Sequence, residues 1–368
     1  FKDTEGNENS RTTTVKVEDD SALVKPIIKS VFPANNNLIK VNTPATVSVK
    51  LDDGSVKEFG MKIYTLTLNP AYDVHAFAET FAPYHENLAQ VQSREAGGKG
   101  VNISRALNMG QIPNTAVIVL GKENGGDFKE SLQQSEIQCI LLEKEGRIRE
   151  NLTLHCADAP ETRISFTGFS VDDSILNEVM DVLQVDGDTV ITFTGRVASG
   201  IHMETVKTFL KKLREKGARI VLDSKSFSLE DIYQVQPWLI KPNQEEISEY
   251  FRCDVKTIHQ AMEKAACFAN HGVDNVMVSL GEQGALLING GKSYIAKPPV
   301  VQAVSTIGAG DSSIAGFLAA AHRGGGAQEC LKMAVTFGTA ACLTTGTLPP
   351  RKIDVDRIWA QVEVTEVM

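Results

Sequence analysis

Val304-Ser305-Thr306-Ile307-Gly308-Ala309-Gly310-Asp311-Ser312-Ser313 is the stretch from which the rest of the chain can be interpreted. β-branched residues lead into a Gly-Ala-Gly turn, and the small residues from Ser312 to Ala321 then predict a helix. The first amides of a helix have no intrahelical acceptor, and the helix dipole places partial positive charge there. The stretch therefore predicts a phosphate site, where the carboxylate of Asp311 can take a proton from a hydroxyl. The alternative is that Asp311 only caps the helix.

The composition of the chain is that of an ordinary globular protein. It has 368 residues, of which 42% are hydrophobic and 23% charged, and a net charge of −9. A net negative charge does not favour binding to nucleic acid or to an anionic membrane. Local cations and helix N-termini must therefore hold any anionic substrate. No apolar run has the length of a membrane span, and no signal-peptide pattern is visible. The six scattered cysteines lack a CxxC pair, which argues against zinc and favours a cytoplasmic protein with reduced thiols.

Residues 1–60 differ in pattern from the remainder of the chain. A polar start is followed by short β-like stretches at Val24–Val31, Leu38–Val41 and Thr46–Leu51. We interpret this segment as an N-terminal appendage, either a small β-element or foreign sequence joined to the chain. Met61 opens a new pattern, so we expect the main domain to span residues 61–368.

Strand and helix patterns alternate after Met61. The expected strands are Ile63–Leu68, Val117–Leu120, Thr189–Thr194, Arg219–Asp223, Leu239–Ile240 and Val276–Ser279. The expected helices are Asn102–Met109, Phe128–Gln134, Ile175–Leu183, His202–Lys216, Glu245–Tyr250, Thr257–His271 and the run after Asp311. This alternation predicts an α/β fold with a mostly parallel sheet between two layers of helices. Ligands of such sheets bind beyond the carboxyl ends of the strands.

Two regions, residues 77–96 and 149–168, alternate apolar and polar residues instead. That pattern is typical of antiparallel strands with one face in water, and it predicts a small β-strand lid on the main domain. An exposed apolar face on such a lid favours a homodimer that covers it.

Two stretches early in the main domain suggest a sugar site. Asp73 follows the first strand, where its carboxylate can accept hydrogen bonds from two sugar hydroxyls, although an Asp after Pro70 is also a common turn residue. Gly97-Gly98-Lys99-Gly100-Val101-Asn102 opens a helix with glycines, a cation and an amide, which suits a sugar phosphate. This stretch is neither a Walker loop nor a dinucleotide-binding turn.

Two later stretches suggest a nucleotide site. Asn243 and Glu246 lie three residues apart on one helical face and can organise hydrated magnesium and phosphates, but the same spacing is a capping box. Ser279-Leu280-Gly281-Glu282-Gln283-Gly284 forms a glycine turn that lets the backbone approach a nucleotide, or simply a hairpin.

Taken in order, these motifs resemble those of the ribokinase-like (PfkB) carbohydrate kinases. The match rests on Tyr64–Pro70, the GGKGVN stretch, Lys241-Pro242-Asn243-Gln244 and Thr306–Asp311, and it covers roughly 300 residues. It is nearest the branch that phosphorylates sugar phosphates, which includes 1-phosphofructokinases and tagatose-6-phosphate kinases. The resemblance implies a ribokinase-like three-layer α/β/α fold.

The resemblance also implies a role for each matching residue, with ATP and Mg²⁺ as cofactors. Asp311 is the expected catalytic base, and the amides of Ala309, Gly310 and Asp311, after the Gly308 turn, are the expected anion hole. The expected sugar-phosphate ligands are Asp73, Gly98, Lys99, Asn102 and Arg149. The expected ATP ligands are Lys241, Asn243, Ser279, Gly281 and Gly284, with Glu246 acting on magnesium through water.

One loop departs from the pattern of this family. Relatives usually carry Gly-Ser-Leu-Pro-Pro-Gly where this chain has Gly195-Arg196-Val197-Ala198-Ser199-Gly200, and Arg196 is either an extra phosphate ligand or a solvated loop residue. The reaction that we expect is phosphorylation of a ketohexose phosphate by ATP, with fructose 1-phosphate first, then tagatose 6-phosphate and fructose 6-phosphate. A sugar-phosphate sensor is the non-enzyme alternative, disfavoured by the intact Asp311 turn. Lys99 disfavours a nucleoside kinase.

Overall fold

A large twisted sheet organises the protein in the computed structural model, which describes residues 47–50, 56–59, 61–157 and 161–367. This ten-stranded sheet has the order β16-β15-β14-β13-β12-β11-β10-β3-β6-β7. The seven strands from β13 to β7 are mutually parallel, and β14, β15 and β16 add antiparallel pairs at one edge. The expectation of a mostly parallel sheet is confirmed.

The parallel strands lie close to the positions that the sequence predicts. They are β3 (Lys62–Thr67), β6 (Thr115–Gly121), β7 (Cys139–Lys144), β10 (Thr189–Thr194), β11 (Arg219–Asp223), β12 (Leu239–Ile240) and β13 (Asn275–Ser279). The antiparallel edge is formed by β14 (Ala285–Asn289), β15 (Lys292–Lys297) and β16 (Glu363–Val367). Every residue of β10 is buried, as expected for a central strand covered on both faces.

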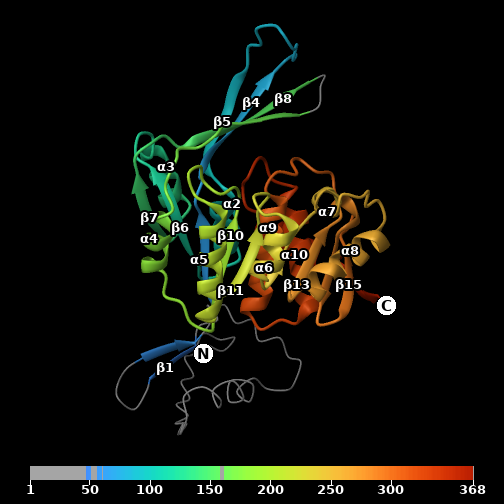
Figure 1. The fold of residues 1–368 in the computed structure, drawn as a ribbon. Helices are drawn as coiled ribbons and strands as arrows, with labels where there is room; N and C mark the ends of the chain where they lie inside the picture. Colours follow the sequence, from blue (N-terminus) through green and yellow to red (C-terminus); the bar gives the residue numbers. More distant parts are fainter. Residues whose placement is uncertain (1–46, 51–55, 60, 158–160, 368) are drawn as a thin grey trace, which may run out of the picture. The chain divides into compact units, whose positions relative to one another are not determined.

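Helices cover both faces of the sheet, as Figure 1 shows. One layer contains α4 (Ile175–Val182), α5 (Met203–Glu215), α6 (Leu229–Val235), α7 (Gln244–Phe251) and α8 (Ile258–Asn270). The other contains α2 (Lys99–Met109), α3 (Gly126–Gln134), α9 (Ala309–His322), α10 (Ala327–Ala341) and α11 (Lys352–Trp359). In β11, Leu222 packs in the first layer and Val221 in the second, because successive side chains of a strand point to opposite faces. The three-layer α/β/α architecture is therefore confirmed.

A separate four-stranded sheet forms the lid that the sequence predicts, with the order β5-β4-β8-β9. Its strands are β4 (Ala71–Ala78), β5 (Gln90–Gly97), β8 (Arg149–Cys156) and β9 (Thr162–Ser165). β4 begins at residue 71, six residues before the expected start, and it pairs with β8 in parallel, so the lid is mixed rather than purely antiparallel. Asp73 consequently lies within β4, not at the end of the first strand.

The N-terminal region is described only in part. β1 (Val47–Lys50) and β2 (Val56–Phe59) form an antiparallel pair, and β1 falls within the expected stretch Thr46–Leu51. The expected strands at Val24–Val31 and Leu38–Val41 lie outside the described residues. Within the part of the chain that the structure describes, no helix combines the length and the apolar character needed to cross a bilayer.

Candidate active site

The order of the strands reverses between β3 and β10, and the candidate site lies beyond the carboxyl ends of the strands around this point. From β3 the sheet continues through β6 on one side, and from β10 it continues through β11, β12 and β13 on the other. The crevice at such a reversal is where open α/β sheets bind ligands. The carboxyl ends of β3, β10 and β11 and the residue after β12 bring polar or charged side chains to the same edge: Thr67, Thr194, Asp223 and Lys241.

The turn before α9 has the geometry of an anion site. Gly308 is the N-cap with φ 77°, a left-handed conformation that glycine adopts without strain. In the described residues the amides of Gly310 and Asp311 have no backbone acceptor, while that of Ala309 donates to Thr306 O at 3.4 Å. Two amides at a helix N-terminus therefore face the crevice, where they favour negative charge.

Asp311 is buried at the first turn of α9. Its Oδ2 accepts a hydrogen bond from Asn102 Nδ2 at 2.9 Å, which joins α9 to α2. Burial raises the pKa of Asp311 to about 6, while the charge of Lys99 and the Asn102 hydrogen bond oppose the rise. A carboxyl group with a pKa near neutrality is suited to accept a proton and release it again.

Two lysines and Asp223 form a charged cluster beside this carboxylate. Lys99 Nζ lies 2.9 Å from Asp223 Oδ2, and Lys241 Nζ lies 3.7 Å from the same oxygen. Burial alone would raise the pKa of Asp223, but Lys241 and Lys99 hold it below its usual value. Burial likewise opposes the charge on Lys99, yet Asp223 and then Asp311 outweigh it and raise the pKa of this lysine. Lys99 therefore stays charged.

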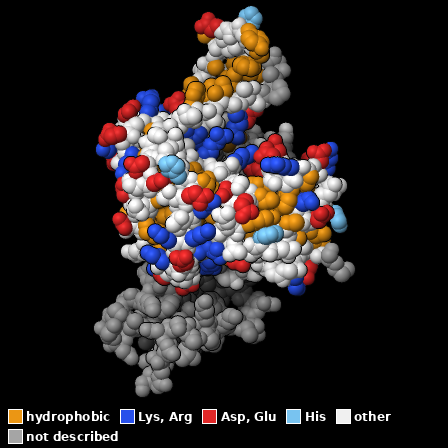
Figure 2. Space-filling model, in the orientation of Figure 1, with side chains coloured by type: hydrophobic (Ala, Val, Ile, Leu, Met, Phe, Trp, Pro, Cys, Tyr) orange, Lys and Arg blue, Asp and Glu red, His pale blue; other side chains and the backbone are white. Residues whose placement is uncertain are grey.

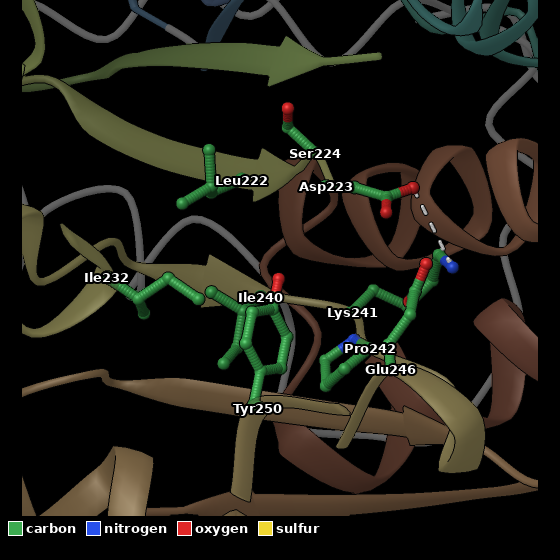
Figure 3. Close-up of a pocket in the computed structure, with 9 residues that line it drawn as sticks. All are labelled: Leu222, Asp223, Ser224, Ile232, Ile240, Lys241, Pro242, Glu246 and Tyr250. Carbon is green, nitrogen blue, oxygen red and sulfur yellow. Dashed lines mark ion pairs between the residues drawn. The ribbon is translucent and has the colours of Figure 1, made fainter. Parts of the chain in front are cut away.

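Lys241 also lies against the glycine turn. A Cβ atom on Gly310 would stand 3.0 Å from Lys241 Nζ, so only the absent side chain leaves room for the ammonium. Figure 3 shows the ion pair of Lys241 and Asp223 at the ends of β11 and β12. Both residues line a small pocket, together with Leu222, Ser224, Ile232, Ile240, Pro242, Glu246 and Tyr250. Burial raises the pKa of Tyr250 to about 12, so its hydroxyl remains a neutral hydrogen-bonding group.

Asn243 and Glu246 form the capping box that the sequence allows. Asn243 Oδ1 accepts from Glu246 N at 2.7 Å, and Glu246 Oε2 accepts from Asn243 N at 3.1 Å. Glu246 Oε1 remains 3.7 Å from Lys225 Nζ at the mouth of the crevice. Asn243 also pairs with Ser279 in an isolated parallel bridge, so the turn that carries Gly281 and Gly284 lies beside this helix start. The two stretches suggested for a nucleotide are thus neighbours.

The described residues could supply only a small part of a magnesium coordination shell, so water and phosphate oxygens would have to supply the rest. No group of three or more His, Cys, Asp or Glu side chains that could enclose a metal ion occurs among them. Magnesium in phosphoryl-transfer sites takes one or two carboxylates, with water and phosphate oxygens completing its shell. Glu246 Oε1, whose charged partner is the half-exposed Lys225 at 3.7 Å, fits that arrangement.

The lid supplies the remaining candidates. Asp73 Oδ1 accepts from Asn151 Nδ2 at 2.9 Å, and Gly97 leaves space for the Asp73 carboxylate, which any Cβ there would overlap. Arg149, the first residue of β8, donates from Nη1 to Asn151 Oδ1 at 2.9 Å. Gly98, with φ 116°, leads from β5 directly into α2 and so carries Lys99 and Asn102 into the crevice.

Several buried polar atoms around the crevice have no partner within the described part of the protein. They are Thr67 Oγ1, Asn69 Oδ1, Asn102 Oδ1, Arg149 Nε and Thr194 Oγ1. Buried polar groups are ordinarily hydrogen-bonded, because an unmade bond is costly. This concentration of free donors and acceptors marks the crevice as a site for a polar ligand.

Sequence reasoning missed Asp223 and Asn151. Asp223 ends the buried strand β11, and a carboxylate at that position of a parallel sheet is itself a signal for the site. Asn151 carried no such signal, because only its pairing opposite Asp73 across β4 and β8 gives it a role.

Comparisons with known proteins agree with this geometry. Residues 66–353 match the pfkB family of carbohydrate kinases. The chain is 30% identical to the 1-phosphofructokinase of Bacillus subtilis (strain 168) over 284 residues, covering 77% of this chain and 93% of the relative. It is 32% identical to the 1-phosphofructokinase of Escherichia coli (strain K12) over 259 residues, covering 70% and 83% respectively. The crystal structure of phosphofructokinase-2 from Escherichia coli with substrates and products superposes with a TM-score of 0.77 at 26% identity, covering 82% of this chain and 99% of that structure.

Proposed function

The chain belongs to the pfkB family of carbohydrate kinases, and from this membership we propose that it transfers the γ-phosphoryl group of ATP to fructose 1-phosphate. The product would be fructose 1,6-bisphosphate. The observation that carries the proposal is the position of Asp311, a buried carboxylate beside two unpaired amides and two charged lysines. Phosphoryl transfer depends mostly on positioning and charge stabilisation, which is what these groups provide.

In this proposal Asp311 is the general base. Its carboxylate accepts the proton of the attacking sugar hydroxyl as the oxygen approaches phosphorus. Asn102 holds one carboxylate oxygen through its amide at 2.9 Å, which fixes the direction of the other. The raised pKa makes the group more basic than an exposed Asp while leaving it largely ionised at neutral pH.

The cations and amides around Asp311 have the second task, which is to stabilise negative charge on the phosphoryl group. The amides of Gly310 and Asp311 point into the crevice from the start of α9, and Lys241 lies against the same turn. Such fixed dipoles and charges need no rearrangement during the reaction. Asp223 pairs with both lysines and holds them in place.

We assign ATP to the side of the crevice formed by β12 and β13. The backbone around Ser279, Gly281 and Gly284 lets the nucleotide approach, and Asn243 anchors the adjacent helix start. When bound with ATP, magnesium would neutralise charge on the phosphates, and Glu246 is the residue placed to hold it. Asp73 and Gly98 would contact the sugar on the lid side.

A coupled ADP-release assay tests the proposal. We would supply Mg-ATP with fructose 1-phosphate, fructose 6-phosphate, tagatose 6-phosphate or unphosphorylated fructose in turn. We expect the highest kcat/KM with fructose 1-phosphate. A preference for another phosphorylated ketohexose would keep the reaction and replace the substrate. No ADP release with any of the four sugars, with ATP still bound, would favour the alternative of a sugar-phosphate sensor.

We further propose that residues 61–368 form the kinase unit, that the protein is cytoplasmic and that it is a homodimer. All six cysteines are free thiols, which agrees with a reducing compartment.

A further inference from the structure

Two arginines from distant parts of the chain meet beside the sugar side of the crevice. Arg149 opens β8 in the lid, and Arg196 lies in the loop after β10 of the main sheet. Ser170 and Ser199 form an isolated parallel bridge, and Val171 N donates to Ser199 O at 2.9 Å, so the loop that carries Arg196 lies beside the segment that reaches Arg149 at Gly168. Burial lowers the pKa of Arg149, Asp73 opposes this change, and the charge of Arg196 adds to it. Figure 2 shows basic side chains gathered at the foot of the four-stranded sheet.

Neither guanidinium is neutralised by a carboxylate. Among the residues that the structure describes, no Asp or Glu oxygen lies within 4.0 Å of either group. Arg149 donates from Nη1 to Asn151 Oδ1 at 2.9 Å and to Phe166 O at 3.3 Å, and its buried Nε has no partner. Asp73 attracts Arg149 from farther away, but its Oδ1 already accepts from Asn151. Two adjacent unpaired cations are unfavourable unless an anion joins them.

The backbone holds Arg196 firmly at this place. Gly195 N donates to Asp223 O at 3.0 Å, and Val197 N donates to Ser226 Oγ at 3.1 Å, so the residues on both sides are fixed to the main sheet. Gly195 has φ 82° and faces Lys99, whose Cβ lies 4.0 Å from the position of a Cβ on Gly195. The exposed Arg196 side chain makes no hydrogen bond within the described residues. A fixed backbone with a free guanidinium is an arrangement suited to ligand binding.

Lys99 is in the opposite situation. Its ammonium is 2.9 Å from Asp223, and Asp311 and Glu246 also act on it, so it belongs to the acidic cluster around the transferred phosphoryl group. The sequence-based expectation that Lys99 binds the phosphate of the substrate therefore meets a competitor, because Asp223 already neutralises this lysine. The unpaired arginines are better placed to supply the missing charge.

We propose that Arg196 joins Arg149, which the family resemblance already implies as a sugar-phosphate ligand, in binding the phosphate already present on the sugar, and that Arg196 determines the preference for phosphorylated over free ketohexose. This inference rests on the proposed function. A phosphate dianion matches two guanidinium groups in charge and can accept paired N–H bonds from each. The neighbouring free atoms, Arg149 Nε and Asn69 Oδ1, lie around Gly168, where a Cβ would stand 3.4 Å from Arg149 Cδ.

Steady-state kinetics of Arg196→Ala and Arg196→Lys test the proposal. Arg196→Ala should raise KM for fructose 1-phosphate about 10- to 100-fold, the range expected for a charge-assisted hydrogen bond, and leave kcat and KM for ATP nearly unchanged. Arg196→Lys should recover part of the affinity, since it restores the charge but not the paired geometry. The kcat/KM for unphosphorylated fructose should not change, so the ratio of kcat/KM for fructose 1-phosphate to that for fructose should fall by the same 10- to 100-fold.

Arg323→Ala is the matched control. Arg323 is exposed beyond the end of the 14-residue helix α9, about 20 Å from Asp311 along the axis, and donates to Gly110 O at 3.1 Å. The Arg323→Ala substitution also removes one arginine charge from the surface, and it should leave KM for fructose 1-phosphate within twofold of wild type. An unchanged KM in Arg196→Ala, or an equal rise in Arg323→Ala, would overturn the proposal.

Binding of inorganic phosphate separates this proposal from the assigned reaction. Titration calorimetry should show weaker phosphate binding by Arg196→Ala than by wild type and Arg323→Ala, whether or not any fructose phosphate is turned over. If wild type phosphorylates none of the sugars but keeps this Arg196-dependent binding, the reaction is wrong and the phosphate site stands. Identical phosphate binding by all three proteins would rule out the site.

Discussion

At the residue scale, the environment of Asp311 joins stability to function. The carboxylate is buried, bonded to Asn102 and surrounded by charges that nearly balance, with Lys99 and Lys241 opposing Asp223. Desolvation is the largest influence and raises the pKa of Asp311 to about 6. The folded protein therefore maintains a group that costs free energy when ionised at neutral pH, as is common for catalytic side chains.

The protonation of Asp311 predicts that kcat falls at acid pH. A carboxylate acts as a base only when deprotonated, so kcat should fall as pH drops through about 6 and should level off above about 7. We would measure kcat at saturating substrate, because kcat/KM also follows ionisation of the sugar phosphate, whose second pKa lies near 6. Asp311→Asn should lower kcat roughly 10²- to 10⁴-fold and flatten this profile, with ATP affinity retained. Normal turnover in that variant would contradict the assignment of the base.

Asp223 provides a second prediction at the same scale. Asp223→Asn leaves Lys241, whose side chain is 8% exposed, and Lys99, at 36%, without their carboxylate. Losing one partner of a buried ion pair typically costs 3–5 kcal/mol, and partial solvation of Lys99 reduces this to roughly 2–4 kcal/mol of unfolding free energy. Urea unfolding would measure the change. Asp254→Asn, which removes an exposed pairing with Lys256, is the control and should have no measurable effect.

At the scale of elements, periodic patterns predicted several of the helices that have one wet face, but not the short α6 and α11. α5 was expected at residues 202–216 and spans Met203–Glu215, because its buried Val206, Phe209 and Leu210 alternate with charged residues. No helix was predicted for Ala327–Ala341, where α10 lies. α10 packs on α9 and also contacts strands β14 and β15, so apolar residues surround much of it and the amphipathic signal is weak.

Pairing between distant strands was beyond the reach of sequence patterns. Both lid regions were recognised from alternation, but the parallel register of β4 with β8, such as Asp73 opposite Asn151, depends on the whole fold. The glycine turn, Lys99 and Lys241 were identifiable because each belongs to a local motif. Asp223 and the approach of Arg196 to Arg149 were not, since they arise from elements that meet only in three dimensions.

The crossing of α9 and α10 supports the glycine turn at residues 308–311 and gives a prediction at the scale of elements. Gly316 of α9 faces α10 so closely that a Cβ would stand 2.9 Å from Phe337 Cβ and overlap the Met333 carbonyl. Gly316→Ala should therefore cost about 1–3 kcal/mol of unfolding free energy through overpacking. Gly126→Ala, at the first residue of α3 with nothing within 4 Å, is the matched control and should be neutral or slightly stabilising. Equal urea midpoints for the two variants would show that α9 and α10 move apart at little cost, which would contradict the prediction.

At the scale of the whole molecule, the lid leaves apolar surface uncovered. Val91 pairs with Ala76, and Ile164 with Leu152, so these side chains lie on one face of the four-stranded sheet. Val91 is 60% exposed and Ile164 43%, and Figure 2 shows an apolar band along the projecting sheet. The opposite face carries Asp73, so this sheet has an apolar side and a side that bears the proposed sugar ligand.

This two-sided sheet predicts that assembly and sugar binding are linked. If a second copy covers the apolar side, the double variant Val91→Asp with Ile164→Asp should shift the protein from dimer to monomer in sedimentation velocity, because buried unpaired carboxylates oppose association. Ile353→Asp, at an equally apolar but separate position that is 75% exposed on α11, should remain dimeric. KM for the sugar phosphate should rise in the monomer, since β4 and β8, which carry Asp73 and Arg149, pair with β5 and β9, which carry Val91 and Ile164. A wild-type protein that sediments as a monomer at micromolar concentration would contradict this assembly. A monomeric variant with unchanged KM would instead separate assembly from binding.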